Sequence, residues 1–506
     1  MIQNKVLILI GIIFLNTCLA LGQKYDYQWL FGYKTDTSII HPDFGRSVID
    51  FSTSPPDIYY EDRNINLDLT VVSICDTSGN LLFYTNGIVV VNHLHEIMEN
   101  GNGLNPGAIA NSFEFWGYPN IQGALALPLP NSDSIFYLIH QRIEYSTPNL
   151  PGHGSTLFLT QIDMGKNNGL GKVITKNEPI INDILEIGNL TATKHANGRD
   201  WWILHGKFDS NQFYTLLLTP DGLENHGIQE VGTFAPTGIG QAIFSPDGSK
   251  YTKLDIVSAN TGSFLNIYDF DRCTGQLSNH IQMTHADSVN IGGVAISPNS
   301  RYLYMTARTL VFQYDLWAMD IEASKDTVAI HDGYFDSIGL SPNFFLTQLA
   351  PNGKIYINSS NSVKDLHVIN SPDSAGLACN LEQHSLQLPT YNKFSLPNFP
   401  NYRLGALSGS ICDSLTTAIS TTAGSNDILL YPNPANDFII FDGDNEEGNY
   451  TFILNNLIGQ EIYQKEVFID NETLINLPEL PVGTYIYNLV LDGKIEKTGK
   501  LIIGRK

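Results

Sequence analysis

The sequence is poor in positive charge, in charged residues generally and in long apolar runs. Its 28 Lys and Arg residues stand against 51 Asp and Glu residues, which gives the 506-residue chain a net charge of -23. A surface of this sign repels nucleic acid and anionic membranes, so neither is expected as a partner. Beyond residue 22 no apolar stretch reaches the roughly 20 residues that span a bilayer, and no transmembrane segment is expected there. Helical periodicity is nearly absent between Gln23 and Cys412.

The N-terminus has the composition of a secretory signal peptide covering residues 1–22. A positively charged start precedes an apolar run over residues 6–15, and the small residues Ala20 and Gly22 occupy the cleavage positions. The stretch 15–18 weakly resembles a lipobox, which leaves a lipoprotein as the alternative. The chain after Gly22 is therefore expected to be exported.

Cysteine is scarce, and four cysteines remain after removal of the leader: Cys75, Cys273, Cys379 and Cys412. In an oxidising compartment an even number is typical of disulfides, although buried thiols would also account for them, and three pairings are open. The spacings contain neither a CxxC pair nor a Cys/His ligand pattern. No metal site is therefore predicted from them.

The main feature of the chain is a repeat of about fifty residues. Each copy has an apolar strand, a tight turn such as Pro-Asp-Gly, and a second strand rich in aromatic and β-branched residues, which predicts a β-hairpin. The turns lie 50 to 66 residues apart, at Gly79, Ser132, Gly198, Gly248, Ser300 and Gly353. A four-stranded propeller blade has a period of this length. We therefore predict an all-β fold with a β-propeller over residues 23–412.

The predicted propeller has seven blades, with six or eight as alternatives. Six hairpins are explicit, and residues 23–412 leave room for a seventh repeat. The last blade could combine both ends of the region, with residues 43–52 supplying a strand alongside the segment around Leu396 to Leu407. Closure of this kind removes the exposed sheet edges of an open array.

Several short motifs carry a family resemblance. The hairpins with Ser-Pro-Asp-Gly resemble the TolB-type, WD40-like propeller repeat. The stretches FGRSVIDFS, CDTSGNLLFYTNG, KHANGRDWW, YDFDRCTG and SLPNF together resemble a group of exported propeller proteins common in Bacteroidetes. This resemblance implies a fold and an exported location, and it implies no particular ligand.

The C-terminal region differs in composition. Residues 413–427 are small and polar, which is typical of a linker, and residues 428–506 alternate short strands with turns, as in a small Ig-like antiparallel β-sandwich. This tail resembles the type A sorting domain of the type IX secretion system, through Pro432, Asn433, Pro434, Gly459, Gly483, Tyr485 and Lys500. The resemblance implies transport across the outer membrane, recognition by the translocon and cleavage by its sortase. It also implies that the protein is attached to the cell surface or released.

The sequence contains no motif for catalysis or for a cofactor. Neither G-x-S-x-G nor H-E-x-x-H occurs. Asp269 and Asp271 would lie on one side of a strand and could hold calcium or serve a glycosidase, but turn capping and solvation account for them as well. We expect no catalytic residues and no cofactor, with calcium left open.

The candidate site lies on the loops at one rim of the propeller, where binding residues usually gather. The longest such loop is expected at Gln141–Thr156. The residues expected to contact a ligand are His140, Arg142, Glu144, Tyr145, His153, His205 and Arg308. These features favour a non-catalytic binding or scaffold protein for a protein or glycan. The alternatives are a secreted hydrolase or lyase acting on polysaccharide or peptide at the channel mouth, and a component of an adhesion or gliding apparatus.

Overall fold

The computed structural model describes residues 23–33, 43–148, 150–258, 262–285, 291–412, 429–431, 433, 435–442, 448–456, 460–469, 472–481, 483–491 and 494–504. The expected signal peptide and linker lie outside these residues, as do Pro432, Pro434 and Gly459 of the sorting motif. The chain divides into two compact units, Met1–Leu415 and Thr416–Lys506.

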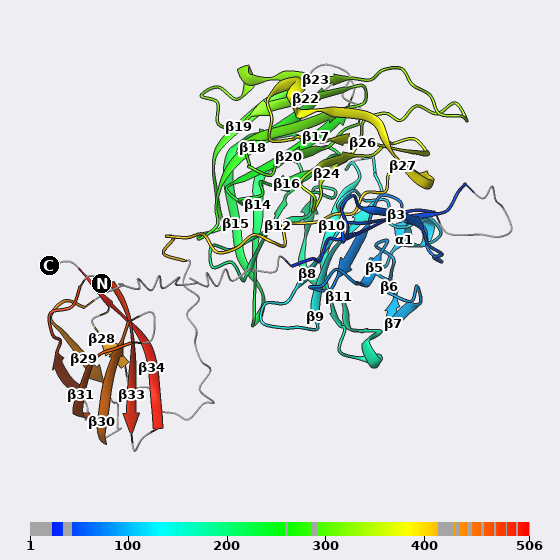
Figure 1. Cartoon of the computed structure of the whole chain (residues 1–506). Helices are drawn as coiled ribbons and strands as arrows, with labels where there is room; N and C mark the ends of the chain where they lie inside the picture. The colour runs from blue at the N-terminus through cyan, green and yellow to red at the C-terminus, as the bar shows by residue number, and fades with distance from the viewer. Residues whose placement is uncertain are drawn as a thin grey trace, which may run out of the picture. The chain divides into compact units, whose positions relative to one another are not determined.

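The first unit is a seven-bladed β-propeller, as predicted (Figure 1). Within each blade consecutive strands are neighbours and run antiparallel. Among the described residues the first blade has three strands and the others have four, while a single parallel pair between Glu99 and Lys172 joins the second and third blades into one sheet. Besides these strands, the part of the unit that the structure describes contains one short helix and three short 3₁₀ helices.

The blades comprise the following strands: β1 (Gln28–Gly32), β2 (Arg46–Asp50), β3 (Asp57–Tyr60); β4 (Val72–Cys75), β5 (Leu81–Thr85), β6 (Val89–Asn92), β7 (Ile97–Asn102); β8 (Ala124–Pro128), β9 (Ile135–Glu144), β10 (His153–Asp163), β11 (Lys172–Leu185); β12 (Thr191–Lys194), β13 (Trp201–Gly206), β14 (Ser210–Thr219), β15 (Gly222–Ala235); β16 (Ala242–Phe244), β17 (Lys250–Ser258), β18 (Gly262–Asp271), β19 (Gln276–His285); β20 (Val294–Ile296), β21 (Tyr302–Ala307), β22 (Leu310–Asp315), β23 (Asp326–Ile330); β24 (Thr347–Leu349), β25 (Ile355–Ile357), β26 (Val363–Ile369), β27 (Leu381–Asn392). The helix α1 (Ala108–Ser112) precedes β8, and the 3₁₀ helices are η1 (Asn167–Gly169), η2 (Glu322–Ser324) and η3 (Gly376–Cys379).

All six predicted hairpins are confirmed as the first two strands of their blades. Local turn chemistry explains this agreement. Gly248 has a φ of +74° and Gly353 a φ of +78°, values that glycine adopts without steric cost. We call the end of the propeller that carries these six turns the turn end. The opposite end, with the links between blades, is the loop end.

The first strands lie at the centre of the ring, where β12, β16, β20 and β24 contact one another in turn. The first blade differs, because β1 runs antiparallel to β4: the Ser73 hydroxyl donates to the Gln28 carbonyl (2.7 Å), and the Leu67 N–H donates to the Gly32 carbonyl (3.0 Å). The innermost position of this blade is therefore left to another part of the chain.

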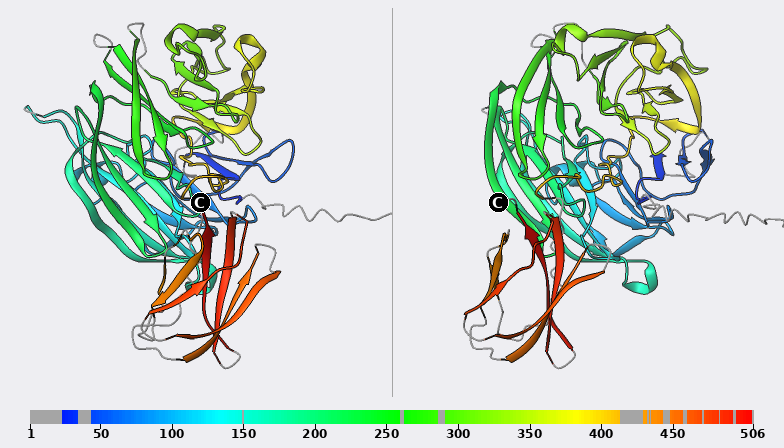
Figure 2. Two further views of the ribbon diagram at one scale, coloured as in Figure 1. Left: turned by 90° about the vertical axis from the view of Figure 1, so that its left-hand side faces the viewer. Right: turned by 60° about the vertical axis from the view of Figure 1, so that its left-hand side comes forward.

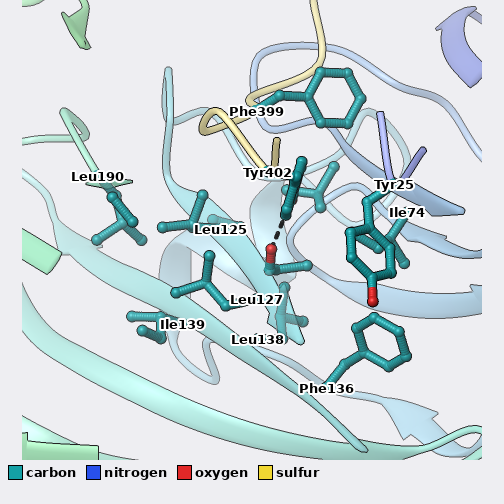
Figure 3. Packing of buried hydrophobic residues seen from close by; sticks show 14 of the residues in the cluster. Tyr25, Ile74, Leu125, Leu127, Phe136, Leu138, Ile139, Leu190, Phe399 and Tyr402 are labelled. Atoms are coloured by element: carbon teal, nitrogen blue, oxygen red, sulfur yellow. Dashed lines mark hydrogen bonds between the residues drawn. The ribbon is translucent and has the colours of Figure 1, made fainter. Parts of the chain in front are cut away.

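Residues 393–412, which we call the axial segment, fill that position and run down the channel (Figure 2). The Tyr402 hydroxyl donates to the Ala126 carbonyl (2.7 Å) deep in the core (Figure 3). The Asn398 amide donates to the carbonyls of Ala124 (2.9 Å) and Leu190 (2.8 Å), so one side chain joins two blades.

The predicted partner of residues 43–52 was therefore wrong. Strand β2 pairs with β1 and β3, and the axial segment forms no ladder with it. The segment instead bonds to several blades at once, through side chains and through backbone groups such as the Asn398 N–H, which donates to the Val71 carbonyl (3.0 Å).

Contacts between the first and last blades close the ring. Trp29 and Tyr356 meet edge to face, with their ring centroids 5.6 Å apart. The hydroxyls of Ser47 and Thr390 lie 2.8 Å apart in a hydrogen bond. The backbone contributes as well, because Phe44 and Tyr391 form a parallel bridge in which the Tyr391 N–H donates to the Asp43 carbonyl (2.8 Å).

At the turn end the axial segment is fastened by a disulfide between Cys273 and Cys412, whose Cα atoms are 5.5 Å apart. Cys75 and Cys379 are free and buried. Of the alternatives left open by the sequence, both a disulfide and buried thiols are present.

The second unit is the predicted β-sandwich. One sheet contains β28 (Leu429–Tyr431), β29 (Phe438–Asp442) and β32 (Glu472–Asn476); the other contains β31 (Glu461–Ile469), β30 (Gly448–Asn455), β33 (Gly483–Leu491) and β34 (Lys494–Ile503). Phe441, Phe452 and Tyr487 pack in its core. No helix among the described residues is long and apolar enough to cross a membrane.

Candidate functional site

His140 is buried in the third blade. One ring nitrogen lies 2.7 Å from the Asn105 side-chain oxygen, and the other lies 2.8 Å from the Thr160 hydroxyl. Burial lowers the pKa of His140 to about 3, so the ring is neutral at physiological pH. These contacts suit a residue that holds its blade together.

Arg142, Glu144, Tyr145 and His153 lie nearer the loop end of the same blade. The Arg142 Nε donates to the Glu144 carboxylate (2.7 Å), and the Tyr145 ring is half exposed. The predicted loop is shorter than expected, because residues 141–144 and 153–156 belong to β9 and β10. Contact of these four residues with a ligand stays a prediction.

His205 and Arg308 lie on two other blades. His205 is buried, with its Nε2 3.0 Å from the Gln141 side-chain nitrogen, and burial lowers its pKa. Arg308 follows β21 and is exposed. The seven predicted residues therefore lie at different depths, with His140 and His205 within the protein interior.

The loop end of the channel contains a cavity that sequence reasoning missed. Its volume is about 390 Å³, and Phe394 of the axial segment forms part of its wall. We call it the apolar cup, and it is lined by Leu69, Ile121, Ile239, Gly240, Ile256, Val257, Ile291, Gly292, Phe345 and Phe394. No polar side chain belongs to this lining, which comes entirely from described residues.

A repeated signal could have revealed the cup. Leu69, Ile121, Ile239 and Ile291 each stand three residues before the first strand of their blades. In a closed ring equivalent positions meet around one axis, so an apolar residue repeated there produces an apolar mouth. Read singly, each residue resembles ordinary core.

Asp68 adjoins the cup through its neighbour Leu69. Its Oδ1 is buried and has no hydrogen-bond partner among the described residues. Burial raises the pKa of Asp68 to about 6, and the nearby Lys393 opposes this only in part. At neutral pH the ionised carboxylate therefore destabilises the folded protein.

Replacing Asp68 by asparagine is expected to stabilise the protein at pH 7 by about 1–2 kcal/mol. The pKa is about 6 in the folded protein and about 3.9 in the unfolded chain, so the carboxylate penalty is absent below pH 4 and grows as the pH rises to 6. Urea unfolding at pH 4 and pH 7 measures the difference. D57N, at an exposed aspartate, is the control; an equal gain at both pH values would contradict the interpretation.

Exposed aromatic residues gather at the loop end. Phe115 and Trp116 meet edge to face, with centroids 4.8 Å apart, in the link between the second and third blades. The aromatic side chains more than a third exposed at this end are Tyr60, Phe115, Trp116, Tyr145, Phe234, Tyr334 and Phe335. Among the described residues of the propeller, only Trp317 is comparably exposed at the turn end.

A buried ionic cluster lies between the fourth and fifth blades. The Lys253 ammonium is 2.5 Å from the Glu186 carboxylate and 3.3 Å from that of Asp255, and all three side chains are at most 3% exposed. Burial lowers the pKa of Lys253, but the two carboxylates raise it by more, so the lysine stays charged. The cluster is closed to a substrate and is therefore structural in this conformation.

The two strand aspartates considered for calcium have other partners. Asp269 forms an ion pair with Lys250 and accepts a hydrogen bond from Asn279 (2.7 Å), which lower its pKa against the effect of burial. Asp271 accepts the Cys273 N–H (2.8 Å), as in a capped turn. In the part of the chain that the structure describes, no group of three His, Cys, Asp or Glu residues could hold a metal ion.

In the second unit the sorting residues make structural contacts. The Asn433 amide donates to the Lys500 carbonyl (2.7 Å) and its oxygen accepts the Ile502 N–H (2.8 Å), which joins the start of the sandwich to its last strand. The Tyr485 hydroxyl donates to the Pro481 carbonyl (2.7 Å).

These features define a β-propeller followed by a small β-sandwich. Residues 429–504 match the family of the secretion system C-terminal sorting domain. The chain therefore carries a type IX sorting domain that interacts with the secretion machinery, and it is exported across the outer membrane to the cell surface or the medium.

Solved structures similar to the chain include a candidate 6-phosphogluconolactonase from Bacteroides fragilis (13% identity, 72% of this chain and 97% of that chain, TM-score 0.40). Others are a periplasmic gluconolactonase from Pseudomonas aeruginosa (14%, 73% and 97%, 0.36) and a hypothetical selenium-binding protein from Sulfolobus tokodaii (10%, 95% and 96%, 0.38). These TM-scores are too low for the similarity to bear on function. No curated protein matches the chain.

Proposed function

We propose that this exported propeller is a non-catalytic binding protein that holds a partner protein at its loop end. The observation that carries the proposal is the apolar cup. Its volume of about 390 Å³ suits one or two apolar side chains, and its wall comes from several blades and the axial segment. Rigid strands thus hold the loops of the mouth in a fixed ring.

The lining of the cup favours a protein over a glycan. Sugar hydroxyls placed there would lose their hydrogen bonds to water and find no polar side chain in exchange, which is costly. An apolar side chain has no hydrogen bonds to water to lose, and its transfer from water into the cup is favourable. The exposed aromatics around the mouth fit the same partner, since Trp, Tyr and Phe are enriched at protein interfaces.

The hydrolase or lyase alternative would need convergent carboxylates in an open pocket. Of the carboxylates described above, Glu186 and Asp255 are sealed between blades, and Asp68 stands alone beside the cup. The observations therefore favour binding.

The test is selection from a displayed random-peptide library and, in parallel, a glycan array, both with the full chain. We expect peptides with an apolar anchor to be selected, and their affinity to fall at least tenfold in I239E, which places a charge at the cup. L377E, a similar change at an exposed residue of the turn end, is the matched control and should bind normally. Selection of glycans alone, of no ligand, or of peptides insensitive to I239E would each overturn the proposal.

A further inference from the structure

The turn end of the channel contains a second cavity, of about 260 Å³, on the opposite side of the propeller from the apolar cup. We propose that this turn-end cavity binds a neutral monosaccharide. Its wall combines the inner edges of four first strands with the axial segment, including Ala192, Phe244, Ile296, Leu349, Phe399 and Arg403.

The strand edges present peptide groups to the cavity. In β16 the Ser245 N–H donates to Lys250, and the Leu254 N–H donates to Gln241, so the odd-numbered residues pair with β17. Because pairing alternates along an antiparallel strand, the N–H and C=O of Phe244 point away from β17 and toward the axis. The same alternation in β12 and β20 turns the peptide groups of Ala192 and Ile296 inward.

One layer deeper in the channel, side-chain amides satisfy the equivalent groups. Gln122 accepts the Ala242 N–H (2.7 Å) and donates to the Ala242 carbonyl (2.9 Å). Gln241 does the same for Thr347, at 2.9 and 3.2 Å. In this deeper layer, glutamine side chains therefore form the hydrogen bonds of the backbone groups that face the axis.

At the level of the cavity this arrangement stops. Among the described residues, Leu349 has an amide partner, since Gln348 donates to its carbonyl (3.2 Å), whereas the inward groups of Ala192, Phe244 and Ile296 have none. Donors and acceptors therefore alternate around the wall. A hydroxyl both donates and accepts, so a polyhydroxylated ligand matches this pattern.

The axial segment adds Arg403, which forms an ion pair with Asp26 beside the first blade. Arg403 donates to the carboxylate of Asp26 (2.5 Å), which is 2% exposed, and the remaining donors of the guanidinium have no partner among the described residues. Phe399 also belongs to the wall, and its ring packs against those of Trp29 and Tyr402. The pair is electrically neutral and the whole chain is strongly acidic, so a neutral ligand is favoured over an anion.

The size of the cavity limits the ligand. At about 260 Å³ the cavity is slightly smaller than the usual range for small-molecule sites, which suits a single small ligand. A hexose is of this size, and a longer oligosaccharide would have to extend into solvent.

Calorimetry and saturation-transfer NMR on the full chain test the inference, with D-glucose, D-galactose, D-mannose and N-acetylglucosamine as probes and glucuronate as an anionic counterpart. At least one neutral sugar is expected to bind. R403K keeps a positive charge beside Asp26 but removes the planar fork of donors, and should weaken binding at least tenfold. R301K, in the Arg301–Asp315 pair outside the cavity, is the matched control and should bind normally.

A second variant, Q348W, fills the cavity and should abolish binding whether or not R403K folds, with thermal unfolding as the check on each variant. Binding of none of the neutral sugars, binding of glucuronate alone, or binding unchanged in both variants would overturn the inference. Sugar binding lost in I239E but kept in Q348W would place the ligand at the loop end instead, and would contradict both this inference and the proposed choice of a protein partner there.

Discussion

Replacing Lys253 by methionine is expected to destabilise the propeller by about 3–5 kcal/mol, because it removes the ammonium group that pairs with two buried carboxylates. Glu186 and Asp255 are both 0% exposed, so neither can be solvated by water when the ammonium is lost. Methionine fills a similar volume, so the decrease in stability comes from the lost charge and not from altered packing. Urea unfolding at pH 7 measures it.

The matched control lies on the same strand. K250M breaks the ion pair with Asp269, whose groups are partly exposed, and should cost no more than about 1 kcal/mol. Adding E186Q and D255N to K253M should restore much of the stability, because these three positions then carry no buried charge. If K253M and K250M lowered the free energy of unfolding equally, burial of the cluster would not increase its contribution to stability.

Replacing Cys273 by serine should lower the stability of the propeller by about 3–5 kcal/mol, since the disulfide with Cys412 spans 139 residues and restricts the unfolded chain strongly. In the folded protein, the axial segment also loses its covalent link to the fifth blade. Denaturant unfolding measures the first effect, and limited proteolysis of residues 393–412 measures the second.

Reducing agent provides the control for this prediction. It should bring the wild-type protein to the stability of C273S and leave the variant unchanged, whereas C379A, at a free buried thiol, should keep its response to the reductant. A C273S protein that matches the wild type in both measurements would mean that the side-chain contacts of the axial segment suffice to hold it.

The fold could be predicted because its signals are local. A turn such as Ser245–Gly248 selects its hairpin through glycine at positive φ and side chains that bond the nearby backbone, whatever surrounds it. Regular spacing of such turns then indicates a ring. The sorting domain was likewise recognisable from motif residues such as Asn433, which joins two ends of the sandwich.

The site was predicted less well, because exposure depends on distant parts of the chain. His140 and His205 were expected at the rim as polar residues near strand ends, yet each is buried with hydrogen-bond partners from elsewhere. The residues of the apolar cup, in turn, look like core until the blades bring them to one mouth.

The sequence by itself determined the all-β architecture, a repeat of propeller length and the route of export, since each rests on contacts or motifs within a few dozen residues, whereas the number of blades, seven, was settled by the structure. Only the tertiary structure decided that Cys273 pairs with Cys412, that the axial segment occupies the channel, and that a cavity lies at each end of it. These features join residues far apart in the chain, and their partners are selected by the closure of the ring, which no local pattern encodes.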